Sequence, residues 1–289
     1  MSLIRFDGEH QITSAAQALE CLRRALMSEK PSVHFTAMRQ AGQLCPWFQE
    51  LADLIGVEQS PVHHAEGDVW THTMMVLDEA VVYKEKAQDP LGFMMGALTH
   101  DFGKAVCTEL IDGQIHAYEH EIRGLPLAEA FLERLGVEES RRAYVCNLIR
   151  YHMQPNALTA QGASVKAMNR MFDKALDPMA LVCLATADGR GKLSTLPYVS
   201  YEESLLESLQ VYYDYLARPH VEQADLAQAG VAEGEPMEQC LAWARKLQLA
   251  GVDQKNQLTQ TLSFARQAGF LPPLPKKKRR KKKKQDTVN

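Results

Sequence analysis

The stretch LGFMMGALTHDFGKA, residues 91–105, carries an apolar helix that ends on an adjacent histidine and aspartate. Asp89-Pro90, immediately before it, predicts a helix start with an aspartate cap and a first-turn proline. Apolar residues occur all round this predicted helix, which indicates that it lies at the centre of a helical core. Gly103, just beyond the histidine–aspartate pair, is typical of a helix end.

Other stretches show the spacing of amphipathic helices, and almost none alternates with the period of two that strands require. Ser14 and Asp68 are typical helix caps, and Asp177-Pro178 repeats the cap-and-proline start. Asp112-Gly113 predicts a turn that can carry a small hairpin. We therefore predict an all-α fold, with helices over about 14–29, 34–41, 46–55, 69–86, 90–101, 120–135, 138–152, 178–189, 202–217 and 237–251.

The composition is that of a globular protein. Hydrophobic residues make up 46% and charged residues 24% of 289 residues, so a sizeable core can form. No apolar run approaches the ~18 residues that span a bilayer, and no secretory signal is evident, so we expect a cytoplasmic protein with no membrane partner. The six cysteines lack any CxxC pair, which is typical of free thiols in a reducing compartment.

Charge is distributed unevenly along the chain. Residues 276–284 read KKKRRKKKK, whereas residues 1–275 carry 23 Lys and Arg against 35 Asp and Glu, a net charge of about −12. An acidic body argues against a nucleic-acid surface on the folded part. The basic run is either a segment that contacts RNA phosphates or a disordered, solvated tail.

Four histidines and two aspartates lie at or near the ends of five predicted helices. Two of them, Asp101 and Asp188, stand in a last helical turn, where a carboxylate faces the negative end of the helix dipole at a cost of roughly 0.3–1 kcal/mol. A bound cation would reverse that penalty, although each aspartate could instead pair with Lys104 or Arg190. Each histidine could likewise be a core or helix-capping residue. The candidate metal ligands are His72, His100, Asp101, His120, His152 and Asp188.

Imidazole and carboxylate together are the ligand mix of catalytic divalent metals in a helical pocket. His72, His100, Asp101 and Asp188 suffice for one ion, and the two remaining histidines would complete a second site bridged by Asp101. The expected cofactor is therefore one or two ions of Mn, Mg, Ni, Co or Fe. Such ions activate a hydroxide and polarise a phosphate ester, so a phosphorylated small molecule or nucleotide is the expected partner.

The substrate contacts are predicted from charge and position. Lys104, three residues past Asp101, would lie at the rim of the metal site, and we interpret these two residues as catalytic. The loop histidines His63, His64 and His116 are weaker candidates for touching substrate or metal. The residues assigned to substrate binding are Lys104, Arg123, Arg190 and His64.

The pattern resembles the HD-domain superfamily of metal-dependent phosphohydrolases, and more narrowly the C-terminal helical part of bacterial tRNA nucleotidyltransferases, the CCA-adding enzymes. The stretches that carry this resemblance are HHAEGDVWTHTMMVLDEA (63–80), GALTHDFGKA (96–105), HAYEHEIRGLPLAEAFLERLGV (116–137) and LATADGRGK (184–192). The resemblance implies an HD helical bundle with flanking helices and phosphatase or 2′,3′-cyclic phosphodiesterase activity. It implies the ligands His72, His100, Asp101 and Asp188, with His120 and His152 matching the two-metal members.

The resemblance also suggests how the chain is organised. We predict an N-terminal helical lead-in over 1–60, an HD metal-binding domain over 61–215, a C-terminal helical segment over 216–275 and a disordered polybasic tail over 276–289. Nothing in residues 1–60 resembles the nucleotidyltransferase head of the CCA-adding enzymes. Nucleotide addition is therefore not expected of this sequence.

Two alternatives to a phosphohydrolase remain. The first is a headless RNA-binding module that holds RNA through its helices and residues 276–284. The second is a di-iron oxygenase, because the same His and Asp ligands suit iron and some two-metal HD proteins resemble such oxygenases.

Overall fold

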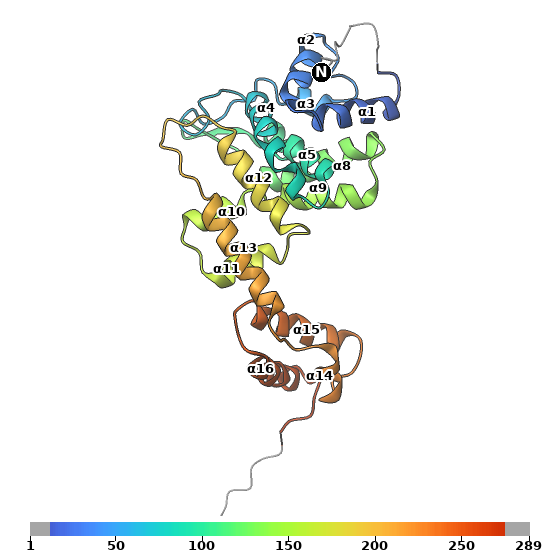
Figure 1. Cartoon of the computed structure of the whole chain (residues 1–289), viewed down its shortest axis with the longest axis vertical. Helices are drawn as coiled ribbons and strands as arrows, with labels where there is room; N and C mark the ends of the chain where they lie inside the picture. Colours follow the sequence, from blue (N-terminus) through green and yellow to red (C-terminus); the bar gives the residue numbers. More distant parts are fainter. Residues whose placement is uncertain (1–11, 275–289) are drawn as a thin grey trace, which may run out of the picture. The chain divides into compact units, whose positions relative to one another are not determined.

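The computed structural model describes residues 12–274, and the regular secondary structure of these residues is almost entirely helical (Figure 1). The chain divides after Tyr213 into two compact units. The polybasic run at 276–284 lies outside the described residues. The all-α prediction is confirmed, and a single two-stranded hairpin is the only sheet in the part of the chain that is described.

The first unit begins with three helices, α1 (Ala15–Leu26), α2 (Pro31–Gln40) and α3 (Gln49–Ala52). Ser14 caps α1 as predicted, by accepting a hydrogen bond from the backbone of Gln17. The helix predicted over 46–55 is wrong in extent, because the chain turns on either side of the four-residue α3 to bury Phe48 and Leu54. Helix α2 packs on α4, where the Ser32 hydroxyl donates to Asp78 at 2.6 Å.

The core of this unit is a group of helices around α5 (Pro90–Thr99), whose residues from Gly92 to Thr99 are all buried. Aspartate side chains cap α4, α5 and α12 at the positions that the sequence predicts: Asp68, Asp89 and Asp177. The elements packed against α5 are α1, α4 (Val69–Ala80), the 3₁₀ helix η1 (Val81–Lys86), α9 (Glu139–Tyr151) and α12 (Pro178–Arg190).

Between α5 and α9 the chain forms short elements. After α6 (Lys104–Cys107), strands β1 (Glu109–Ile111) and β2 (Gln114–His116) pair antiparallel through Asp112 and Gly113, which confirms the predicted hairpin. The helix predicted over 120–135 is interrupted at Gly124 and consists of α7 (His120–Arg123) and α8 (Leu125–Arg134).

Two helices that the sequence did not predict follow α9. They are α10 (Gln154–Ala160) and α11 (Val165–Phe172). Pro155 ends the predicted helix pattern, but in the structure it stands in the first turn of α10, where proline's missing N–H costs nothing.

Helix α13 (Glu202–Ala217) runs across the division between the units. The second unit then contains α14 (Gln223–Gln228), α15 (Glu235–Gln248) and α16 (Gln254–Gln267). Its core includes Leu226, Met237, Cys240 and Ala265, and Trp243 stacks on Phe264 with ring centroids 4.7 Å apart. None of the helices in residues 12–274 is both long enough and apolar enough to cross a bilayer.

Candidate metal centre

Five separate elements deliver the six predicted ligands to one buried cluster. His72 lies in α4, His100 and Asp101 directly follow α5, and His120 begins α7. The remaining two are His152, which directly follows α9, and Asp188, in the last turn of α12. All four histidines and Asp101 are buried, and the Asp188 side chain is 14% exposed.

The ligand atoms fall into two groups that Asp101 connects. In the first, His72, His100 and Asp188 each offer an atom within 4.8 Å of the others, and in the second Asp101, His120 and His152 do the same. Asp101 Oδ1 lies 3.3 Å from His120 Nε2, whereas Asp101 Oδ2 lies 3.3 Å from His100 Nε2. One carboxylate oxygen therefore faces each group, which is the arrangement of a bridging ligand.

Several of these atoms have no hydrogen bond of acceptable geometry within the described residues. They are His72 Nε2, His100 Nε2 and both carboxylate oxygens of Asp101. The Lys104 ammonium forms an ion pair with Asp101 Oδ2 at 2.7 Å, and the other three atoms face only the histidines and carboxylates of the cluster. A buried polar atom without a partner costs about 1–3 kcal/mol, so their convergence is the property of a cation site. The donor set of imidazole nitrogen and carboxylate oxygen fits divalent metals.

Each ligand histidine is oriented by a hydrogen bond at its other ring nitrogen. Nδ1 of His100, His120 and His152 lies 2.7–2.9 Å from the backbone carbonyl of the residue three positions earlier, at Ala97, Ala117 and Ile149. A carbonyl can only accept, so Nδ1 carries the proton and Nε2 presents its lone pair to the cluster. Such outer contacts fix the tautomer of metal-binding histidines.

Three groups of the cluster, Asp101, Asp188 and His152, are held in the protonation states that metal ligands need. His72 is the exception: burial opposes the change, but its hydrogen bonds with Asp188 and Glu66 raise its pKa, so a metal would displace a proton there. Burial opposes ionisation of Asp101, but His100, Lys104 and His120 hold its pKa well below its usual range. Burial likewise opposes ionisation of Asp188, but the hydrogen bond with His72 lowers the pKa of this carboxyl group. Burial, together with His100 and His120, lowers the pKa of His152 to about 3. Ionised carboxylates and a neutral imidazole are the forms that bind metal.

Two glycines allow the ligand-bearing segments to come close together. A Cβ on Gly103 would lie 2.0 Å from the backbone oxygen of His120, and a Cβ on Gly191 would lie 2.6 Å from the Cα of Val76. The first contact joins the segment after Asp101 to α7, and the second joins the end of α12 to α4. Any side chain at either position would therefore displace backbone that carries a ligand.

The other predicted residues lie in different surroundings. Lys104 is at the cluster, where its ammonium also donates to Gln59 Oε1 at 2.8 Å. His64 is there too, with its ring centroid 4.8 Å from that of His72. Arg190 pairs with Glu202 at 2.7 Å, and Arg123 is exposed on α7.

The two weaker loop candidates, His63 and His116, belong to neither of these ligand groups. His63 is exposed, and His116 stacks on Tyr118 with ring centroids 4.8 Å apart.

Sequence reasoning missed Glu66 and Gln59, which touch the ligands or Lys104 directly. Glu66 Oε1 lies 3.1 Å from His72 Nδ1 and 2.8 Å from His64 Nδ1. Both residues precede α4 in a loop, and nothing in their spacing separates them from ordinary surface residues. Glu66 lies six residues before His72, and the two side chains come into contact only because the loop folds back onto α4.

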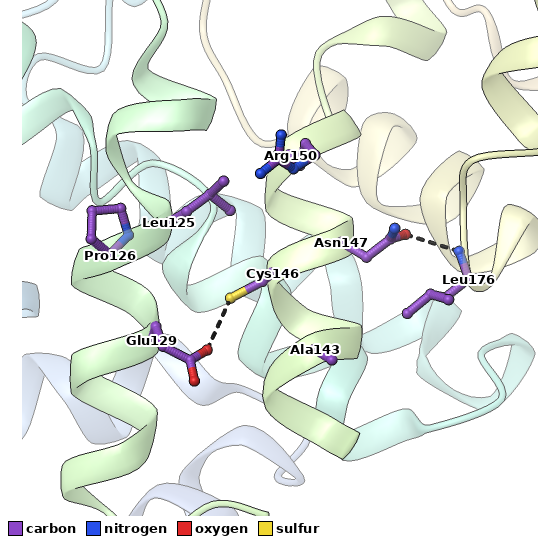
Figure 2. Close-up of a pocket in the computed structure, with 8 residues that line it drawn as sticks. All are labelled: Leu125, Pro126, Glu129, Ala143, Cys146, Asn147, Arg150 and Leu176. Carbon is purple, nitrogen blue, oxygen red and sulfur yellow. Dashed lines mark hydrogen bonds between the residues drawn. The ribbon is translucent and has the colours of Figure 1, made fainter. Parts of the chain in front are cut away.

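A surface groove between α8 and α9 is separate from the cluster, because none of its lining residues belongs to it (Figure 2). The Cys146 thiol donates to Glu129 there, and Asn147 accepts a hydrogen bond from the backbone of Leu176. Burial and the hydrogen bond with Glu129 raise the pKa of Cys146 to about 12, so the thiol is not a nucleophile at neutral pH. The groove has no constellation for acid–base or metal chemistry.

No protein-family model matches the chain. It is similar to proteins named multifunctional CCA protein from several bacteria. The relative from Alkalilimnicola ehrlichii is 30% identical over 244 residues, which are 82% of this chain and 57% of that protein. The one from Methylococcus capsulatus is 31% identical over 257 residues, 86% of this chain and 56% of that protein.

A third relative, from Halorhodospira halophila, is 34% identical over 176 residues, 59% of this chain and 41% of that protein. The chain thus spans just over half the length of the first curated relatives it matches. The relationship to CCA proteins that the sequence predicts is supported, while the HD-domain assignment stays a prediction.

Proposed function

We propose that the first unit is an HD-type, metal-dependent phosphohydrolase that acts on a phosphate ester of a nucleotide or an RNA end. The observation that supports this most is the set of buried, unpartnered atoms on His72, His100 and Asp101, which face one another across a small space. Structural cores rarely leave such atoms unpaired, because the penalty is not offset by anything else in the fold.

The protein's own residues would each have a defined part. His72, His100 and Asp188 would hold one cation, and Asp101, His120 and His152 would hold another. Two divalent cations bound there would polarise the phosphoryl oxygens and lower the pKa of an attacking water. Lys104, held by Gln59 and Asp101, is placed to contact a substrate phosphate.

The substrate class is inferred from the relatives. Their name refers to CCA, and the stretches around the predicted ligands resemble those of tRNA nucleotidyltransferases. An RNA 3′ end or a nucleotide is therefore favoured over an unrelated phosphorylated metabolite.

A hydrolysis screen tests this function. Nucleoside mono-, di- and triphosphates, 2′,3′-cyclic nucleotides and bis-p-nitrophenyl phosphate are each incubated with Mn²⁺, Mg²⁺, Ni²⁺, Co²⁺ or no metal. We expect metal-dependent turnover that disappears in Asp101→Asn and persists in Asp53→Asn, a matched change at an exposed aspartate. Turnover retained in Asp101→Asn would contradict the proposal. Silence across the panel, with iron bound to the purified protein, would favour the oxygenase alternative.

A second candidate is an RNA-binding module, which the similarity to CCA proteins favours independently of the metal cluster. Its basic contacts would come from residues 276–284, outside the described part of the chain. We then expect an RNA affinity, measured by fluorescence anisotropy, that falls steeply between about 50 and 200 mM salt, because each phosphate contact releases roughly one counterion. We also expect this affinity to be lost when residues 276–284 are deleted. Affinity that is unchanged by the deletion would exclude this role for the tail.

A further inference from the structure

The carboxylate of Glu66 lies next to the Nδ1 atom of His72, and the Glu66 side chain is only 1% exposed. Its Oε1 atom faces Nδ1 of His72 at 3.1 Å and Nδ1 of His64 at 2.8 Å. Its Oε2 atom accepts the backbone N–H of Leu193 at 2.9 Å. Both carboxylate oxygens are therefore used.

These contacts determine the tautomer of His72. An ionised carboxylate only accepts hydrogen bonds, so the ring nitrogen that faces it must carry a proton. His72 Nδ1 is thus an N–H group, which leaves Nε2 as the ring nitrogen that can bind a metal; without a metal, Asp188 Oδ1 at 3.1 Å favours a proton on Nε2. His72 differs from the three other ligand histidines, whose Nδ1 groups donate to neutral backbone carbonyls. A carboxylate partner makes an imidazole a stronger ligand than a carbonyl does.

Glu66 also joins two loops that support ligands on different helices. It precedes α4, which carries His72, and it binds Leu193, which follows α12, the helix of Asp188. Backbone hydrogen bonds run alongside it: Ala65 N–H donates to Leu193 O at 2.8 Å, and Thr195 N–H donates to Val62 O at 3.1 Å. Residues 62–66 and 193–195 therefore form a pair of loops, which we call the loop clasp.

We propose that Glu66 is a positioning residue of the metal centre: it fixes the tautomer and direction of His72 and, through the loop clasp, the separation of His72 from Asp188. This inference rests on the proposed metal site. His64, Glu66 and His72 also lie close enough together to suggest a third ion. The hydrogen bonds already satisfy both oxygens of Glu66, whereas the unpartnered atoms of His72 and Asp101 lie on the other side of the His72 ring. The group is accordingly a support for the metal centre and not another ion site.

The test compares Glu66→Gln with Glu121→Gln in the full chain. Glutamine has one acceptor oxygen, whereas the N–H groups of His64, His72 and Leu193 all need an acceptor, so the variant loses at least one of these hydrogen bonds. Glu121 is the matched control, because its carboxylate lies 3.9 Å from Nδ1 of the ligand His120, whose proton already goes to the Ala117 carbonyl. The two readouts are the dissociation constant for Mn²⁺ or Ni²⁺ by calorimetry and the hydrogen bonding of the His72 Nδ1–H group in the metal-free protein by ¹⁵N NMR of labelled histidines.

For Glu66→Gln we expect metal affinity to fall by about 10- to 100-fold and the Nδ1–H signal of His72 to move away from that of a proton hydrogen-bonded to a carboxylate. For Glu121→Gln we expect both readouts to match the wild type. The inference is overturned if either readout of Glu66→Gln matches the wild type. A wild type that binds no divalent metal would refute the proposed function instead, and the Nδ1–H signal of His72 in the metal-free protein would then decide the role of Glu66 by itself.

Discussion

Replacing Gly103 by alanine tests whether the close approach of the segment after Asp101 to α7 holds the site together. The added Cβ would lie 2.0 Å from the His120 oxygen, 2.7 Å from the Gly124 nitrogen and 2.8 Å from the His120 carbonyl carbon. All three are backbone atoms, so no side-chain rotation can relieve the contact. The two segments must separate by more than about 1 Å to restore ordinary contact distances of about 3.5 Å.

The cost follows from that displacement. Overpacking a core by one methyl group costs about 1–3 kcal/mol when side chains can adjust, so a backbone clash belongs at the upper end, at about 3 kcal/mol or more. For a unit of this size each kcal/mol lowers Tm by about 2–4 °C, so we expect a drop of roughly 6–12 °C. Metal affinity should fall as well, because the displaced carbonyl belongs to the ligand residue His120.

Gly96→Ala is the matched control, since Gly96 is also buried, although it lies inside helix α5. Its Cβ would meet only the Leu148 side chain, with the nearest atom, Cδ1, at 3.0 Å, and alanine gains about 1 kcal/mol of helix propensity over glycine. We expect its stability to stay within about 1 kcal/mol of the wild type. Thermal unfolding by circular dichroism and metal titration by calorimetry measure both variants. Equal Tm values and equal metal affinities for Gly103→Ala and Gly96→Ala would refute the reasoning.

Three further predictions concern stability. Asp177 is buried, caps α12 and accepts hydrogen bonds from Gln88 N–H at 2.7 Å and Tyr144 O–H at 3.0 Å. Asp177→Ala should therefore lower the free energy of unfolding in urea by about 3 kcal/mol, against about 1 kcal/mol for Ser14→Ala at an exposed cap. Equal losses in the two variants would contradict this. EDTA should lower Tm and excess Mn²⁺ should restore it, because a ligand that binds only the folded state at 100 times its Kd adds about 2.7 kcal/mol; a Tm that ignores both would contradict a metal centre. The pKa of His152 is about 3 in the folded protein against about 6.5 when unfolded, so the metal-free protein should lose stability as the pH falls below 6.5. His152→Gln should make this loss of stability smaller in acid unfolding curves. An unchanged dependence of stability on pH would contradict the burial of a neutral imidazole.

Local signals were enough to predict most of the helices around the site. The caps Ser14, Asp68, Asp89 and Asp177 all accept hydrogen bonds from the first turn of their helices, because capping depends only on neighbouring residues. The break at Gly124 also had a local signal that the prediction overlooked, because Pro126 stands in the first turn of α8. The close approach of Gly124 to Gly103, which is distant in sequence, becomes visible only after folding.

The candidate site shows the same limit. The six ligands were predicted from residue type and position at helix ends, and the structure brings them together. Arg190 stays a predicted phosphate contact, but the structure also pairs it with Glu202, and a single sequence gives no means of pairing the two. Glu66 went unnoticed for the opposite reason, since its role depends on Leu193, which lies 127 residues away.

The difference between local and distant partners has a consequence for how the site forms and opens. Three of the ligand histidines are oriented by a carbonyl three residues earlier, so they should be organised as soon as those helix ends fold. His72 depends on the loop clasp, which closes only when chain segments 127 residues apart have met. We therefore expect residues 62–66 and 193–195 to exchange their amide hydrogens faster than α5. A local opening of this kind would release one ligand without unfolding a helix, so the rate of metal exchange should follow the opening rate of the clasp and not that of global unfolding.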